Sequence, residues 1–299
     1  MRLSTQPSAQ PRFFLGVDGG GSGTRVRLVD EAGQVLGRGE AGPSGLSQGI
    51  EQAWEHIGMA IGRAFAQAGH ALPPLSDCAL GLGLAGAHSP AQCDRFMALA
   101  PAYARVALDT DAGTALRGAH GGAPGSIVAA GTGSVGEALR RDGRRVSVGG
   151  WGFGIGDEGS GGWLGLAAMR IAHRALDGRA AAGPLARAVW GIAGGQRDAL
   201  LDWSRHAGQH GFARLAPLVF HSADADPAAR RLLDEAAHAL VEMAAALDPD
   251  GDLPLVLIGS IAKRLAPRLP PQWLALVVAP QGDAIDGALQ LAREARILA

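Results

Sequence analysis

The sequence is poor in the residues on which several common kinds of protein chemistry depend. Its one lysine, Lys263, lacks the upstream glycine and the following Ser or Thr of a phosphate-binding P-loop, which excludes a Walker-type NTPase. Its two cysteines, Cys78 and Cys93, have no paired spacing and therefore indicate neither a disulfide framework nor a zinc site. This cysteine usage fits a reducing compartment, so we expect a cytoplasmic protein.

An excess of charge and a long apolar run are missing as well. The 27 basic and 28 acidic residues give a net charge of -1, so no overall field favours nucleic acid or an anionic membrane surface. No apolar run approaches the roughly 18 residues that span a bilayer. Residues 1–12 lack the hydrophobic core of a signal peptide, and we interpret them as a disordered leader. We expect a globular protein with neither a nucleic-acid nor a membrane partner.

Glycine is the residue in excess, with 46 copies, about twice the usual share and without the collagen period. Many of these glycines fall in a pattern that occurs twice. An apolar run at 13–17 enters the turn Asp18-Gly-Gly-Gly-Ser-Gly-Thr24, and a run at 126–130 enters Gly131-Thr-Gly-Ser134; a strand pattern resumes after each turn. The sequence therefore predicts an α/β fold in which an order βββαβαβα is repeated with helical insertions.

A glycine-rich segment at 121–125 marks the boundary between the two halves. We predict an N-terminal domain over 13–122 and a C-terminal domain over 123–299. A last helix over 283–299 could pack back on the first domain. In the second domain the apolar spacing predicts a strand over 274–278 and helices over 161–177, 183–192, 196–206 and 228–247.

The two glycine-rich turns point to phosphate binding. Consecutive glycines expose several backbone N–H groups with no side chain in the way, and such a concavity binds phosphate oxygens. Because Gly19–Thr24 and Gly131–Ser134 belong to different domains, we expect a nucleotide in a cleft between the domains. The run 131–136 also matches a dinucleotide-binding fingerprint, but the hairpin signal Asp142-Gly143 follows where a helix is required. The alternative is that both turns are only hairpin connections.

Two aspartates, one at a strand end and one at the helix start after a strand, are expected to face the same cleft. Asp18 ends a strand, where its carboxylate could hold Mg²⁺ through water; the alternative is an Asx turn. Asp111 opens a helix after a strand at 105–108 and could accept the proton of an attacking hydroxyl. The alternatives are that Asp111 only caps the helix, or that Asp109 is the acid that matters.

The segment 149–165 has too many glycines for an ordinary strand and too many apolar residues for a solvent loop. Trp151 could form one wall of a sugar site, while Asp157 and Glu158 could accept hydrogen bonds from sugar hydroxyls or an amine. The alternative places Trp151 in the core and both acids at a helix N-terminus.

Five motifs in chain order give the sequence a family resemblance. They are Asp18 to Thr24, Thr110-Asp111-Ala112, Gly131 to Ser134, Gly-Asp-Glu-Gly-Ser at 156–160 and Ile-Gly-Ser at 258–260. Over nearly the whole chain beyond residue 12, the sequence resembles the BadF/BadG/BcrA/BcrD group of the sugar kinase, heat-shock protein 70 and actin superfamily. Within that group it looks most like the glucosamine and N-acetylglucosamine kinases. The resemblance implies duplicated ribonuclease H-like domains of the actin-like ATPase type that close on Mg·ATP and an amino sugar.

The resemblance also implies roles for residues that match its motifs. Asp111 would be the base for the sugar 6-hydroxyl, and Asp18 would serve Mg²⁺ and the phosphates. The residues expected at the ATP are Gly19, Gly20, Gly21, Ser22, Gly23, Thr24, Gly131, Thr132, Gly133, Gly259 and Ser260. Those expected at the sugar are Ser134, Trp151, Gly152, Asp157 and Glu158. Members of this group are often dimers, so a homodimer is also expected.

The motifs divide between two substrates. The stretch 42–46 and Val135 lack asparagines with which animal N-acetylglucosamine kinases read the sugar, whereas Trp151-Gly152 keeps the acetylhexosamine kinase pattern. The stretch 258–288 is similar to bacterial glucosamine kinases, so amine and acetamide both stay open. The other functions considered are a kinase for another sugar, an ATPase activator with an iron-sulfur cluster between subunits, and a sensor that binds ATP without transferring phosphate.

Overall fold

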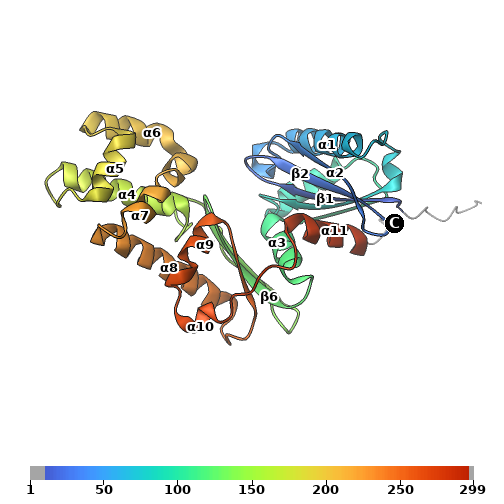
Figure 1. Ribbon diagram of the computed structural model, residues 1–299. Helices are drawn as coiled ribbons and strands as arrows, with labels where there is room; N and C mark the ends of the chain where they lie inside the picture. Colours follow the sequence, from blue (N-terminus) through green and yellow to red (C-terminus); the bar gives the residue numbers. More distant parts are fainter. Residues whose placement is uncertain (1–10, 296–299) are drawn as a thin grey trace, which may run out of the picture. The chain divides into compact units, whose positions relative to one another are not determined.

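The computed structural model describes residues 11–295, which form two compact units with one sheet each (Figure 1). The first unit takes the chain up to Ala123 and again from Pro280, and the second unit is Pro124–Ala279. Most of the expected leader, residues 1–10, and the end of the expected last helix, residues 296–299, lie outside the described part. Within the described part, no helix has the length and apolar character to cross a membrane.

The first unit has a five-stranded sheet of order β3-β2-β1-β4-β5. The strands are β1 (Phe13–Gly19), β2 (Thr24–Asp30), β3 (Val35–Ala41), β4 (Cys78–Leu84) and β5 (Arg105–Thr110). The first three form the antiparallel meander that the glycine turns predict, and β4 and β5 run parallel to β1. The carboxyl ends of β1, β4 and β5 therefore meet at one edge of the sheet, where Asp18, Gly83 and Asp109 stand in register.

Helices cover both faces of this sheet because its buried strands are apolar on both sides. Leu15 and Val17 belong to a core shared with α1 (Ile50–Gln67) and α2 (Pro90–Ala98). Phe14 belongs to a second cluster with α11 (Ala284–Glu294), which lies beside α3 (Asp111–His120). Three short 3₁₀ helices complete the fold of the two units: η1 (Leu46–Gln48), η2 (Leu75–Asp77) and η3 (Ala266–Arg268).

The approach of α11 to the sheet depends on strand glycines. A Cβ at Gly81 would lie 1.9 Å from the backbone oxygen of Ala288 and 2.8 Å from the nitrogen of Ala292. No side-chain movement can relieve a contact with the helix backbone, so any larger residue at position 81 must displace α11.

Gly81→Ala should therefore lower the free energy of unfolding by about 1–3 kcal/mol, the usual cost of overpacking a core. Gly58→Ala is the matched control, because Gly58 is exposed within α1 and no atom lies within 4 Å of its would-be Cβ. That substitution should raise stability by about 0.5–1 kcal/mol, since alanine loses less backbone entropy than glycine. Urea unfolding of the two variants measures both effects. Equal stability of the two would mean that α11 does not pack as closely as described.

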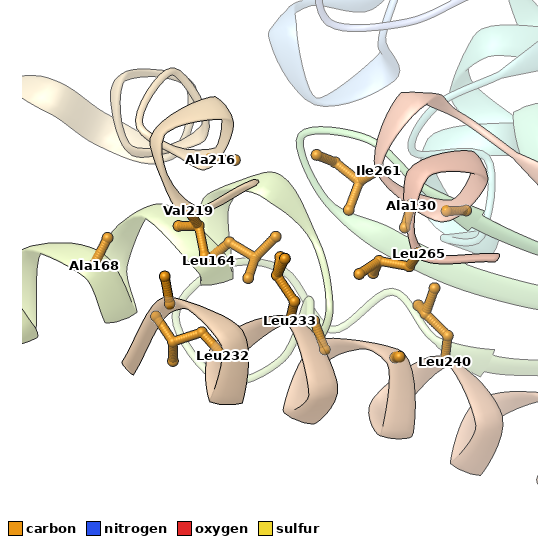
Figure 2. Packing of buried hydrophobic residues seen from close by; sticks show 14 of the residues in the cluster. Ala130, Leu164, Ala168, Ala216, Val219, Leu232, Leu233, Leu240, Ile261 and Leu265 are labelled. Carbon is orange, nitrogen blue, oxygen red and sulfur yellow. The ribbon is translucent and has the colours of Figure 1, made fainter. Parts of the chain in front are cut away.

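The second unit has a four-stranded sheet of order β8-β7-β6-β9. The strands are β6 (Gly125–Ala130), β7 (Ser134–Leu139), β8 (Arg145–Gly149) and β9 (Leu255–Ile258). The helices are α4 (Gly161–Leu176), α5 (Pro184–Ala193), α6 (Arg197–Ala213), α7 (Ala216–Ser222), α8 (Pro227–Leu247), α9 (Ser260–Leu265) and α10 (Pro271–Leu274). Figure 2 shows leucines of α8 lying among Leu164 of α4, Ala130 of β6 and Leu265 of α9. This core fixes the end of β6, from which the second glycine turn starts.

The strand predicted over 274–278 is wrong. Residues Pro271–Leu274 form α10, and only Val277 makes a bridge, with Leu255 of β9. Pro271 stands at the first helical position, where its fixed φ suits a helix and its missing N–H costs nothing. The apolar pattern of 274–278 therefore belongs partly to a helical turn.

Candidate functional site

The loop that follows β3 holds the glycine turn of the first unit through hydrogen bonds. Ser44 N and Gly45 N both donate to Gly20 O, at 3.1 and 3.2 Å, and Gly20 N donates to Gly23 O at 3.0 Å. The Thr24 hydroxyl is buried; it donates to the carbonyl oxygen of residue 42 at 2.7 Å and lies 2.7 Å from Ser44 Oγ. Thr24, expected at the nucleotide, thus has a bracing role in the structure.

The upper side of the same turn is open. Within residues 11–295, the amides of Gly21, Ser22 and Gly23 have no hydrogen-bond partner in the protein. A cavity of about 250 Å³ lies at the turn, lined by Asp18, Gly20, Ser22, Gly23 and Arg25. Free amides around a cavity can bind anionic oxygens.

Asp18 and Arg25 face each other across the β1–β2 pair and form an ion pair. This contact raises the pKa of Arg25, first through the hydrogen bond and then through the charge of Asp18. Arg25 engages only Oδ2 of the Asp18 carboxylate. The pair therefore puts one anion and one cation at the cavity that the turn surrounds.

Asp111 is not the cap of α3. Thr110 is the N-cap residue, and its hydroxyl accepts a hydrogen bond from Gly113 N at 2.9 Å. Asp111 Oδ1 accepts from the adjacent Ala112 N at 3.0 Å, and the residue as a whole is exposed. Thr110 therefore caps α3 in place of Asp111. The Asp111 carboxylate is left available for chemistry.

The surroundings of Asp111 favour its neutral form. Loss of hydration raises the pKa of this carboxyl above its ordinary value, the charge of Asp18 raises it further, and His88 opposes the shift. An acid with a raised pKa is a stronger base once ionised, as a general base requires. Asp109, the competing acid, is half-buried and its Oδ1 accepts from Thr110 N at 2.7 Å.

The glycine turn of the second unit is closed in the same way as the first. Gly131 N donates to Gly133 O at 2.9 Å. The start of α4 braces it, because Gly161 N donates to Gly131 O at 2.8 Å and Gly162 N to Thr132 O at 3.0 Å. The Thr132 side chain is exposed, and within the described chain the amides of Thr132 and Gly133 have no protein partner. This turn also offers free amides and a hydroxyl.

Gly259 lies directly beside that turn, at the carboxyl end of the parallel strands β6 and β9. Its φ of +91° lies in the region that favours glycine, and a Cβ would be 2.4 Å from Ala130 O. Ser260 then opens α9. The fold thus brings the matching motifs at 131–134 and 259–260 together in one unit.

Asp157 is the one non-glycine residue with positive φ between residues 11 and 295, at +59°, and its side chain is 5% exposed. Its Oδ1 accepts from Ser134 N at 3.1 Å, and its Oδ2 accepts from Gln209 Nε2 at 2.5 Å. Ser134 Oγ in turn donates to the carbonyl oxygen of Glu158 at 2.8 Å. A positive φ strains the backbone of a non-glycine residue. Such strain persists where surrounding contacts impose it and is common at ligand sites.

Trp151 does not enter the core. Its side chain is 74% exposed, on a loop that contains Gly152 at φ +81° and closes through a hydrogen bond from Gly156 N to Gly152 O at 2.8 Å. Phe153, between them, packs against Phe212 with ring centroids 5.5 Å apart and anchors the loop. The core alternative for Trp151 is therefore wrong, and the indole is free to contact a ligand.

The structure groups the expected residues by unit. The first unit collects Asp18, the turn 19–24 and Asp111 at one sheet edge, and the second collects the turn 131–134, Gly259, Ser260 and Asp157 at another. The sequence analysis does not include Ser44 and Gln209 among the site residues. Their hydrogen bonds support the turn 19–24 and the pair formed by the turn 131–134 and Asp157. Ser44 lies in the stretch 42–46, which was compared only for its missing asparagines, and Gln209 belongs to no motif, so no local signal marks their supporting contacts.

Comparison with known proteins shows which family the chain is similar to. A family model described as the BadF/BadG/BcrA/BcrD ATPase family matches residues 15–269. The chain is 35% identical over 281 residues to the glucosamine kinase GspK of Vibrio cholerae, covering 94% of this chain and 95% of that protein. A crystal structure of a provisionally named N-acetylglucosamine kinase from Chromobacterium violaceum is 48% identical, with a TM-score of 0.90, over 96% of this chain and all of that one.

A more distant structure supports the fold alone. A ROK family glucokinase from Streptomyces griseus, solved with glucose and AMPPNP, aligns with a TM-score of 0.53 at 19% identity, over 95% of this chain and 99% of that one. The expected duplicated ribonuclease H-like, actin-like architecture is therefore confirmed.

Proposed function

The chain belongs to the BadF/BadG/BcrA/BcrD ATPase family, and on that premise we propose that it is an ATP-dependent hexosamine kinase. It transfers the γ-phosphate of ATP to the 6-hydroxyl of glucosamine or N-acetylglucosamine. The observation that carries this function is the identity to a glucosamine kinase along nearly the whole of both chains. The arrangement of each unit supports it independently.

Asp111 is the proposed general base. Its ionised carboxylate takes the proton of the 6-hydroxyl as that oxygen attacks the γ-phosphorus, the bond to ADP breaks and ADP leaves. Two observations support this role: the Asp111 carboxylate does not cap α3, and its pKa is raised. Free amides of the turns 19–24 and 131–134 would bind phosphate oxygens, and Gly259 and Ser260 would lie on the nucleotide side.

Asp18 is the proposed protein ligand of Mg²⁺. The described residues contain no cluster of three or more His, Cys, Asp or Glu that could hold a metal ion. One carboxylate beside free amides still fits this ion, because protein-bound Mg²⁺ keeps several waters and uses one or two carboxylates together with substrate phosphates. Held there, Mg²⁺ would neutralise phosphate charge during transfer.

The two cysteines argue against the iron-sulfur activator. Such a cluster is held by thiolates. Cys78 is fully buried, and this burial raises the pKa of its thiol to about 12, which keeps it protonated. Cys93 donates its thiol hydrogen to Ala87 O, a contact within its own unit. Both cysteines serve packing.

ADP release from Mg·ATP tests the function when glucosamine, N-acetylglucosamine and glucose are offered separately beside a sugar-free control. We expect release only with an amino sugar, and the preferred one decides between amine and acetamide. Equal release without sugar would favour an activator ATPase. Release with glucose alone would assign another sugar, and no release with any of them would contradict the proposal.

Trp151→Ala should raise the KM for the hexosamine by about tenfold, the usual loss when an aromatic contact is removed from a binding site. Because Trp151 is mostly exposed, its removal should leave the melting temperature unchanged. Ile155→Ala is a matched control from the same loop, with a side chain that is 79% exposed. A lower melting temperature with an unchanged KM would assign Trp151 a structural role instead.

A further inference from the structure

Gln209 contacts two of the family motifs of the second unit, the turn 131–134 and the segment 156–160. Its Nε2 lies 2.5 Å from Asp157 Oδ2 and 3.3 Å from Thr132 O. A primary amide has two N–H donors, so one can serve each acceptor. One side chain thus connects the carboxylate that the family resemblance places at the sugar to the proposed phosphate-binding turn.

The backbone around Gln209 fixes where its side chain lies. Gly208 interrupts α6 with φ 53° and ψ −175°, a conformation that favours glycine, immediately before Gln209. The segment after the break is docked by Phe212, whose ring centroid lies 5.4 Å from that of Trp203. The backbone oxygen of Phe212 would be 1.8 Å from a Cβ at Gly165, so α6 and α4 meet backbone to backbone. This packing fixes the backbone from which the Gln209 side chain reaches its two acceptors.

The two acceptors depend on Gln209 unequally. Thr132 O also accepts from Gly162 N at 3.0 Å, so the turn has a second support. In the described part of the chain, Gln209 is the only donor to Asp157 Oδ2. Asp157 is also strained at φ +59°. Loss of the Gln209 amide should therefore disturb the carboxylate more than the turn.

We propose that Gln209 is a positioning residue of this kinase, which holds the Asp157 carboxylate in the orientation that binds the hydroxyl groups of the hexosamine. The inference rests on the proposed function. Each carboxylate oxygen has two acceptor positions, so the bonds from Ser134 and Gln209 leave one on each oxygen for the substrate. Gln209 acts through Asp157 and itself touches no reacting atom.

Gln209→Met tests this role, because methionine has a similar length and no N–H donor. We expect the KM for the hexosamine to rise on the order of tenfold, as expected when a hydrogen bond to a charged group is lost. The KM for ATP should stay within about twofold, because Gly162 N still holds Thr132 O. Gln209→Glu is the second variant; it keeps the shape but repels Asp157, so the KM for the sugar should rise further.

A double-mutant cycle with Asp157→Asn separates positioning from packing. Once residue 157 has lost its charge, Gln209→Met should add less than about a twofold change in the KM for the sugar, since the two residues act as one unit. Gln196→Met is the matched control: the same substitution at the exposed N-cap of α6, where the side chain makes no capping bond. This control should match the parent in both KM values.

The outcomes are distinguishable. A parent enzyme that phosphorylates no hexosamine would overturn the proposed function and this inference together. An active parent with an unchanged KM for the sugar in both Gln209 variants would overturn only the role of Gln209. Equal rises in both KM values with a lowered melting temperature, or full additivity in the cycle, would also overturn it and leave a packing role.

Discussion

Asp111→Asn should lower kcat for phosphoryl transfer by on the order of 10³-fold, within the range by which a positioned general base accelerates a reaction. The carboxylate can accept a proton because Thr110 caps α3 in its place. An amide at the same position keeps the size and loses the basicity. The affinity for ATP should stay near that of the parent, since the free amides of both turns are untouched. Single-turnover kinetics and nucleotide titration measure the two quantities.

Asp109→Asn is the control for this prediction, because Asp109 stands two residues earlier and was the competing acid. The Asp109 side chain accepts from Thr110 N and is half-buried. Its replacement should therefore lower the free energy of unfolding and leave kcat close to that of the parent. A variant at position 111 that kept most of its activity, beside an inactive variant at position 109, would transfer the role of base to Asp109.

Asp18→Asn should lower kcat by about 10²-fold or more and shift the acid limb of the pH profile to lower pH. The base must be ionised, so the rate falls as the pH drops through the pKa of Asp111. The negative charge of Asp18 raises that pKa, and its removal lowers it. Asp111 in the variant therefore stays ionised to a lower pH, and the limb moves with it.

The same variant should need more Mg²⁺ for half-maximal rate, because a neutral amide is a weaker ligand for this ion. Rates measured across pH at several Mg²⁺ concentrations give both results. Asp94→Asn, an exposed position on α2, is the matched control and should leave both profiles unchanged. An acid limb at the parent's pH would show that Asp18 does not act on Asp111, and an unchanged Mg²⁺ response would remove Asp18 as the ligand.

The repeated glycine turns made the fold predictable from sequence. A strand, a turn of glycines and a second strand give a local signal, and its recurrence after residue 125 indicated duplication. The helices of the second unit were less visible. The expected helix over 196–206 stops close to Gly208, whose non-helical backbone interrupts α6, but the second helical stretch, up to Ala213, and α7, with Pro217 in its first turn, were missed. Tertiary packing decides such segments, and the pattern alone does not contain it.

The parts of the candidate site that lie in glycine turns and at strand ends could be predicted from the sequence. Motif residues at strand ends meet because parallel strands end at one edge of the sheet. This places Asp18 near Asp111, although the two residues are far apart along the chain. The supporting side chains were not predictable. Ser44 and Gln209 act through contacts with residues far away along the chain, such as Thr24, 20 positions from Ser44, and Asp157, 52 positions from Gln209. Only the folded chain brings them there.

The most direct test of the account is the identity of the product. ³¹P NMR of the protein with Mg·ATP and glucosamine, and with N-acetylglucosamine in parallel, shows where the γ-phosphate goes. We expect one phosphomonoester signal, coupled to the protons of the 6-methylene group and equal in amount to the ADP formed, and no such signal with Asp111→Asn. Inorganic phosphate as the only product, or a phosphate at another hydroxyl, would contradict a hexosamine 6-kinase.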